Sequence, residues 1–337
     1  MKRWILRSVW ALLSLLAIVA VTGSVWEAIE RRKATSDFPP LGVLVDVGGR
    51  NIQLDCRGHG SPTVVFESGL DTNGSLNWIQ VQDDIAKFSR ACSYSRAGIL
   101  WSDPGPGPRN GKAIAFDLHA ALDKGGEKPP FVLVGHSMGG PYAMTYVKYF
   151  GDQVAGVVLV DASNPDQGKR FIDAFHTDFS GGMTQMRLMD ALSWTGIIRL
   201  QDAGDPVGSK DEQTIDAYEP QSFHAILSEI DAIADSNAEA GTMRNLGARP
   251  LYVLTAMRPL SAESTAAMGL TPDQGIQFKQ VWKSLQDEEV SWSSVSEHVL
   301  VPDSGHYIQK AKPEKVTAAV HWVVEKVRDA TPHQPNP

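Results

Sequence analysis

The sequence has few cysteines and no long run of charge of either sign. Only two of its 337 residues are cysteine, and 39 acidic residues outnumber 31 basic ones, for a formal net charge of −8. The acidic balance argues against a nucleic-acid partner, because such partners are bound through clustered positive charge. Repeats and low-complexity tracts are also missing, apart from a short polar tail over residues 331–337. With 42% hydrophobic and 21% charged residues, the chain has the composition of a globular protein, either one large domain or a domain with an insertion.

One long hydrophobic run is present, at the N-terminus. Residues 8–26 carry no charge and are mostly apolar, which is about the length that a helix needs to cross a bilayer. A cleaved signal peptide usually has a shorter apolar core and an A-x-A-like cleavage site, which Val21-Thr22-Gly23 matches poorly. We therefore expect a membrane anchor and a linker over residues 1–40, with secretion after signal cleavage as the alternative. Basic residues flank the run on both sides, so charge does not set its orientation.

Beyond residue 40, short apolar runs alternate with segments of helical character. This alternation predicts an α/β fold with a mainly parallel sheet and helices on both of its faces. Residues 164–247 break the alternation and look helical throughout. We therefore expect a core over residues 41–163, a helical cap over 164–247, and the second part of the core over 248–330.

A serine occupies the apex of a predicted strand–turn–helix. Gly135-His136-Ser137-Met138-Gly139 follows the apolar run Phe131–Val134 and leads into a helix-like segment. The two glycines leave room where strand and helix backbones come close. This is the form of a nucleophile elbow, in which the Ser137 hydroxyl is exposed for attack on an acyl carbon. The alternative is a glycine-rich turn in which the serine has no chemical role.

A serine hydroxyl is a poor nucleophile until a base removes its proton. The expected base is a histidine on the loop after the last strand, since such triads run in the order Ser, acid, His. His306, within Asp303-Ser304-Gly305-His306-Tyr307, stands at that position.

With these features the chain resembles the α/β-hydrolases that carry an N-terminal membrane segment. The matching stretches are Gly48-Gly49, Gly60–Val65, Glu67–Leu70, Arg96–Gly98, Trp101–Asp103, Gly135–Gly140, Leu159–Asp161 and Ser304–Tyr307. Two positions depart from the pattern: relatives typically carry Asp in place of Ser95 and tend to have a glycine at Ile99-Leu100. The loop beside the site is therefore expected to differ in shape. The resemblance implies an eight-stranded, mostly parallel sheet and esterase-like activity that needs neither a cofactor nor a metal.

The resemblance offers two positions for the acid of the triad. The usual one follows the seventh strand, where Glu263 is the only nearby acid. The other follows the sixth strand, where Asp161 stands directly after Val160. We predict Asp161, with Glu263 as the alternative; a plain capping role for Asp161 is the competing explanation. The oxyanion would be held by two backbone N–H groups, those of Met138 and Leu70.

The two cysteines bear on the compartment of the catalytic domain. In this fold Cys56 and Cys92 would lie on the neighbouring second and fourth strands, where a disulfide is geometrically possible. A disulfide would favour an exported domain. Two buried free thiols are the alternative.

The function predicted from these residues is that of a membrane-anchored or exported serine hydrolase. Its partners would be the membrane and a small carboxylic ester or thioester. Epoxide hydrolases and dehalogenases of this fold use an aspartate where Ser137 stands, which disfavours those activities. Peptidase, C–C hydrolase and cofactor-free haloperoxidase chemistry share the same triad, and a non-catalytic binding protein can also be built on the same fold. Phe171, Phe175 and neighbouring methionines of the cap either line an acyl pocket or form the cap's own core.

Overall fold

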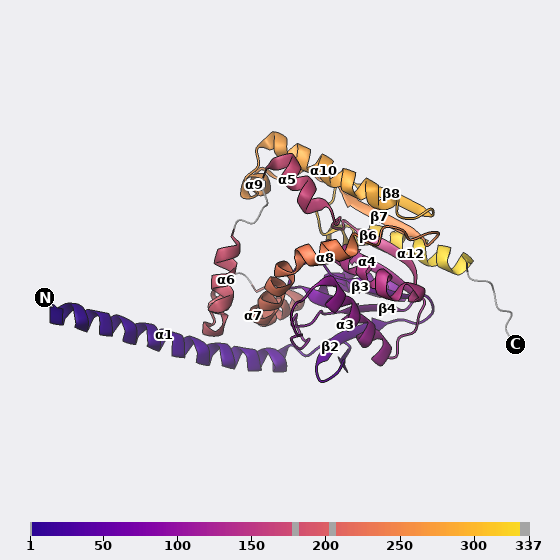
Figure 1. The fold of residues 1–337 in the computed structure, drawn as a ribbon. Coiled ribbons are helices and arrows are strands. Elements are labelled where there is room, and N and C mark those ends of the chain that lie inside the picture. The colour runs from indigo at the N-terminus through magenta and orange to yellow at the C-terminus, as the bar shows by residue number, and fades with distance from the viewer. Residues whose placement is uncertain (1, 177–181, 202–206, 331–337) are drawn as a thin grey trace.

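The computed structural model describes residues 2–176, 182–201 and 207–330; the predicted polar tail, residues 331–337, lies outside them. Eight strands form one sheet in the order β1-β2-β4-β3-β5-β6-β7-β8 (Figure 1). The strands are β1 (Val43–Asp46), β2 (Asn51–Arg57), β3 (Thr63–Glu67), β4 (Ala91–Tyr94), β5 (Phe131–His136), β6 (Val154–Val160), β7 (Leu251–Ala256) and β8 (Ser296–Val301). Pairing is antiparallel from β1 to β4 and parallel from β4 to β8. This confirms the predicted fold class.

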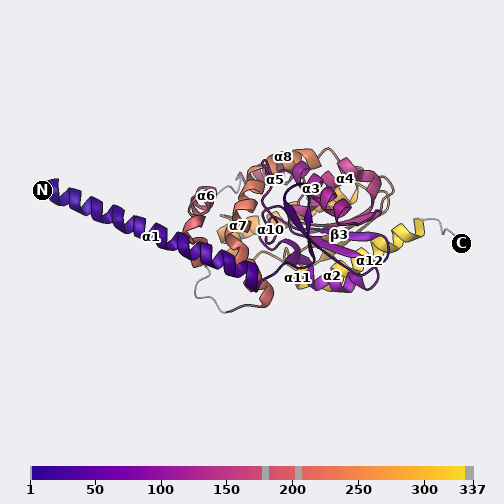
Figure 2. The ribbon, with the colours of Figure 1, turned by 90° about the horizontal axis from the view of Figure 1, so that it is seen from below.

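Helices cover both faces of the sheet, so the central strands are apolar on both sides. In β5, Phe131 and Leu133 pack into one core cluster, while Val132 and Val134 pack into the other. The alternation follows from the two-residue period of a strand. One face is covered by α3 (Gly111–Lys124) and α4 (Gly139–Phe150), and the other by α2 (Ile79–Ala86) and α12 (Pro313–Ala330) (Figure 2).

The chain between β6 and β7, predicted as the cap, is mostly helical in its described part. It contains α5 (Gln167–Phe175), α6 (Met183–Ala191), α7 (Lys210–Asp231) and α8 (Ile233–Ala240), with two short 3₁₀ turns, η3 (Ser193–Thr195) and η4 (Ile198–Leu200). The middle of α7 packs on the loop after β4, where Ser222 accepts a hydrogen bond from the Leu100 amide at 3.0 Å. After β7 come α9 (Ala262–Ala267) and α10 (Pro272–Val290), and α11 (Ile308–Ala311) follows β8.

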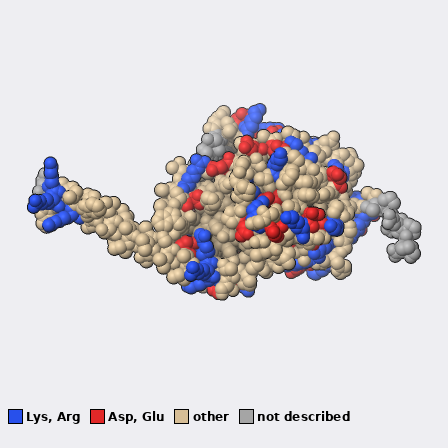
Figure 3. All heavy atoms as spheres, turned by 60° about the horizontal axis from the view of Figure 1, so that its bottom comes forward, with Lys and Arg blue, Asp and Glu red and all other residues tan. Residues whose placement is uncertain are grey.

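The N-terminal helix α1 (Lys2–Asp37) is longer than the sequence suggested, since it continues through most of the expected linker. Its first part projects away from the domain and is apolar, apart from basic residues at its tip (Figure 3). Within the described residues it is the one helix long and apolar enough to cross a membrane. Its last turns pack against the segment between β6 and β7, where buried Glu27 pairs with Arg199 at 2.7 Å.

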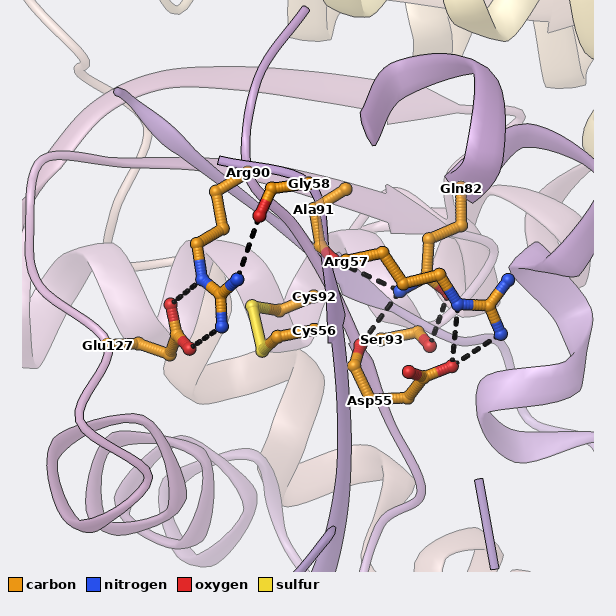
Figure 4. Close-up of a disulfide and its surroundings, with 10 residues drawn as sticks. All are labelled: Asp55, Cys56, Arg57, Gly58, Gln82, Arg90, Ala91, Cys92, Ser93 and Glu127. Carbon is orange, nitrogen blue, oxygen red and sulfur yellow. Dashed lines mark hydrogen bonds and ion pairs between the residues drawn. A yellow bond between two sulfur atoms is a disulfide. The ribbon is translucent and has the colours of Figure 1, made fainter. Parts of the chain in front are cut away.

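A disulfide joins Cys56 of β2 to Cys92 of β4 (Figure 4). The two residues face each other directly in the antiparallel register, with their Cα atoms 4.0 Å apart. Ion pairs flank the bond, among them Arg90 with Glu127. The disulfide therefore crosslinks two neighbouring strands, which is the first of the two alternatives considered for the cysteines.

Candidate active site

Ser137 lies at the turn between β5 and α4 with a left-handed backbone, at φ +53°. A non-glycine residue is strained there, and such strain is common where a side chain must be presented for chemistry. The flanking glycines make the turn possible. A Cβ on Gly135 would lie 2.5 Å from the Gly139 carbonyl oxygen, and one on Gly139 would lie 2.2 Å from the Glu67 oxygen. The pattern of residues thus dictates the sharp elbow that was predicted.

His306 and Asp161 are brought together at the carboxyl ends of the parallel strands. Asp161 directly follows β6, and His306 lies on the loop after β8. His306 Nδ1 is 2.7 Å from Asp161 Oδ2, and the Asp161 carboxylate is almost wholly buried. The imidazole itself is 39% exposed, so one edge of it remains open toward a cavity.

The second oxygen of Asp161 is held by two further donors. Asp161 Oδ1 accepts hydrogen bonds from the Ala256 amide and from Trp282 Nε1, each at 2.8 Å. With His306, three donors converge on one carboxylate. Trp282 was not anticipated from the sequence: it lies 121 residues beyond Asp161 on α10, and no local pattern marks it.

Ser137 and His306 line the same cavity, of about 670 Å³. Its walls also include Gln167, Arg258, Met268, Phe278, Lys279 and Trp282. In the described part of the chain, no direct hydrogen bond joins the Ser137 hydroxyl to His306. Such bonds are often long in the absence of substrate and tighten when it binds.

Glu263, the alternative acid, lies apart from this arrangement. It stands in the first turn of α9 and is exposed to solvent. Among the described residues, the carboxylate bound to His306 is that of Asp161 and not that of Glu263.

One of the two predicted oxyanion donors belongs to the elbow, and the other belongs to the loop after β3. Met138 is the N-cap of α4, and Leu70 follows β3; their side chains pack in one cluster. Within the described residues, neither backbone N–H has a hydrogen-bond partner. Gly69 brings the two segments together, because a Cβ there would lie 3.0 Å from Ser137 Cβ.

His136 is buried beneath the turn. Its Nε2 lies 3.1 Å from the His306 carbonyl oxygen, and its ring packs edge-on against Trp78. Burial, and secondarily the neighbouring His306, lower the pKa of His136 well below 6.5. This histidine therefore stays neutral and supports the loop that carries His306.

The model of the alpha/beta hydrolase family matches residues 20–320. This chain belongs to that family. Among its relatives, the "Probable transporter efuK" of Hormonema carpetanum is 24% identical over 333 residues, which cover 90% of this chain and 44% of that protein. This chain therefore spans less than half the length of that relative.

Solved structures of similar shape include hydrolases of different chemistry. An esterase from Thermogutta terrifontis matches with a TM-score of 0.57 and 17% identity, over 84% of this chain and 97% of that one. An epoxide hydrolase variant from Bacillus megaterium matches with a TM-score of 0.59 and 14% identity, over 84% of this chain and all of that one. At such identities the likeness shows the fold alone.

One group of possible metal ligands occurs in the described part of this α/β-hydrolase. Donor atoms of Cys56, Cys92 and Glu127 lie within 4.8 Å of one another. The two sulfurs are bonded to each other, and Glu127 is paired with Arg90 (Figure 4). These groups are committed to structural contacts and are not free to hold an ion.

Proposed function

We propose that this α/β-hydrolase is a serine hydrolase that cleaves a carboxylic ester or thioester through an acyl-enzyme. The observation that carries the proposal is the placement of Ser137 and of the His306–Asp161 pair on one cavity. The serine at the elbow also favours this chemistry over epoxide hydrolysis, for which the fold uses an aspartate at that position.

In the proposed first step, Ser137 Oγ attacks the carbonyl carbon and His306 Nε2 takes the hydroxyl proton. Asp161 holds the proton on His306 Nδ1 and stabilises the imidazolium that forms. The oxyanion receives hydrogen bonds from the Met138 and Leu70 amides. When the bond to the leaving alcohol or thiol breaks, His306 returns the proton to it, leaving the acyl group on Ser137.

In the second step a water molecule takes the place of the leaving group. His306 removes its proton as it attacks the acyl carbon, and a second tetrahedral oxyanion forms at the same two amides. Collapse releases the carboxylic acid and restores the Ser137 hydroxyl. The two steps consume one water and require no group beyond the residues named.

The cavity wall favours an acyl group with apolar character. Phe278 and Trp282 line it, and Phe171 and Phe175 pack behind them, with the Phe171 and Phe278 rings 4.7 Å apart. Two roles were considered for Phe171 and Phe175: lining an acyl pocket or forming a core. Because they pack in a buried cluster and do not line the cavity, this placement supports the core role.

The location proposed is at a membrane, in which α1 anchors the protein, with the catalytic domain outside the cytoplasm. The disulfide supports this side of the membrane, since such bonds persist in oxidising compartments. Secretion after cleavage of the N-terminal segment is the alternative.

The test is labelling of the detergent-solubilised full chain with a fluorophosphonate, which reacts with activated serines. We expect labelling of the wild type and none of Ser137→Ala, together with turnover of a panel of esters and thioesters. Labelling that persists in Ser137→Ala, or no turnover of any ester or thioester, would contradict the proposal.

A further inference from the structure

A buried arginine is bound to the loop that carries the proposed oxyanion donor Leu70. Arg96 follows β4 and is 3% exposed. It donates to the Ser68 carbonyl from Nη1 and to the Gly69 carbonyl from Nη2, each at 2.7 Å. The guanidinium thus binds the carbonyl oxygens of the two successive residues immediately before Leu70.

The grip on Gly69 fixes the direction of the next N–H. The Gly69 carbonyl and the Leu70 N–H belong to one planar trans peptide, in which the two groups point in opposite directions. Because Arg96 holds the oxygen, the Leu70 N–H points away from the arginine. It has no partner among the described residues, and the elbow lies against this loop at Gly69.

Two carboxylates hold the guanidinium in turn. Glu229 accepts from Nε and Nη2, each at 2.8 Å, and Glu67 accepts from Nη1 at 3.0 Å. With the two carbonyls, all five N–H donors of Arg96 are used. The ring of Tyr142 packs on the guanidinium, with Arg96 Cζ 5.0 Å from its centroid. A planar guanidinium that is bound at all five donors is held in one orientation. The ammonium group of a lysine cannot reproduce this set of hydrogen bonds.

Glu229 connects this arrangement to a distant part of the chain. It lies near the end of α7, in the segment between β6 and β7, 133 residues beyond Arg96. It is fully buried, so its bidentate pair with Arg96 is shielded from solvent. The segment 68–70, which carries the proposed oxyanion donor, is called the oxyanion loop below. The position of α7 therefore affects the position of this loop through one side chain, that of Glu229.

We infer that Arg96 is a positioning residue that aims the Leu70 N–H at the oxyanion, and that Glu229 of α7 holds Arg96 in that position. The inference rests on the proposed serine hydrolase function. It makes the helical segment between β6 and β7 part of the catalytic apparatus, since a shift of α7 would turn the oxyanion donor away.

The experiment compares Arg96→Lys and Glu229→Gln with a matched control, Arg109→Lys, in the detergent-solubilised full chain. Arg109 is also buried and ion-paired, with Asp117 at 2.7 Å, but in the described part of the chain no hydrogen bond or ion pair joins it to the oxyanion loop. For each variant, kcat and KM are measured on p-nitrophenyl acetate. The inhibition constant of a trifluoromethyl ketone, which forms an oxyanion adduct with an active serine, is measured as well.

Loss of one oxyanion donor lowers kcat by about 10²–10³-fold. We expect Arg96→Lys to lower kcat by about 30-fold or more with little change in KM. The affinity for the trifluoromethyl ketone should fall by a similar factor, because kcat and this affinity both depend on stabilisation of the oxyanion. Glu229→Gln should lower kcat and the ketone affinity by about 3–10-fold, because Arg96 loses one of its charged partners. Arg109→Lys should lower the melting temperature without changing kcat or the ketone affinity.

A folded Arg96→Lys with the wild-type kcat and ketone affinity would overturn this inference alone. If that variant does not fold, Glu229→Gln decides: wild-type kcat and ketone affinity would overturn the inference, and a parallel loss of both would support it. Absence of Ser137-dependent turnover in the wild type would instead overturn the proposed function, and this inference with it.

Discussion

Asp161 and His306 lie 145 residues apart in the sequence and 2.7 Å apart in the structure. The contact follows from sheet topology: β6 and β8 are parallel strands with only β7 between them, so their carboxyl ends meet at one edge. We expect Asp161→Asn to lower kcat by about 10³–10⁴-fold. The Ala256 and Trp282 donors fix the amide oxygen at the Oδ1 position, which turns the NH₂ group toward His306 Nδ1 and favours the wrong tautomer. Glu263→Gln is the control. Steady-state kinetics in which Glu263→Gln loses more activity than Asp161→Asn would reverse the assignment.

The sequence predicted those elements whose signals are local. Ser137 is marked by its glycines, His306 by its place after the last strand, and the sheet by its apolar runs. Trp282 could not be predicted, because its contact with Asp161 depends on how α10 packs over the strand ends. The extent of α1 was also missed. The charges after residue 26 suggested a linker, yet Glu, Arg, Lys and Ala are strong helix formers, and the segment gains further support by packing on η3 and α7.

Trp282 should matter through its indole N–H. Trp282→Phe keeps an aromatic side chain but leaves Asp161 with two donors instead of three. A hydrogen bond to a charged group contributes about 1.5–3 kcal/mol, so we expect kcat to fall by about tenfold or more with a smaller change in KM. Trp292→Phe, at a buried position in the core away from the cavity, is the matched control. Equal kinetics for the two variants would show that the indole N–H does not orient the acid.

The lowered pKa of His136 predicts a pH dependence of stability. Below about pH 6.5 the unfolded chain binds a proton at this histidine, while the folded chain does not. The contribution to stability is therefore fully present above that pH and is lost as the pH falls. The free energy of unfolding should decrease by about 1 kcal/mol more between about pH 6.5 and 5.5 in the wild type than in His136→Gln. Urea titrations at both pH values measure this. Identical pH dependence in the two proteins would mean that His136 is not held neutral.

The disulfide should stabilise the fold by restricting the unfolded chain. Cys56 and Cys92 are 36 residues apart, and a loop of that size corresponds to about 3–4 kcal/mol in the chain-entropy treatment. We expect the double variant Cys56→Ala with Cys92→Ala to lose about that much free energy of unfolding, and wild type unfolded under reducing conditions to behave similarly. Thiol labelling of the unfolded wild type without reductant should find no free cysteine. Two free thiols would instead identify the cysteines as buried packing residues.

The last turns of α1 should behave as part of the folded domain and its first turns as a separable anchor. A Cβ on Gly23 would lie 2.2 Å from the Thr195 carbonyl oxygen, and Trp26 packs against Gly196, so helix and η3 are in close contact. Glu27 pairs with Arg199 at 2.7 Å, and the Phe38 carbonyl accepts from Trp101 Nε1 at 2.9 Å. All of these contacts survive in a chain that starts at residue 22 and are lost in one that starts at residue 39.

We therefore expect the chain from residue 22 to be soluble without detergent and to have the same melting temperature as the full-length protein. The chain from residue 39 should melt about 3–5 °C lower, which corresponds to roughly 2–3 kcal/mol for a domain of this size. Glu27→Gln in the longer fragment tests the ion pair alone and should give an intermediate melting temperature, because Arg199 would keep a hydrogen-bond acceptor but lose its charged partner. Equal melting of the two fragments would show that the last turns of α1 contribute nothing to the stability of the domain.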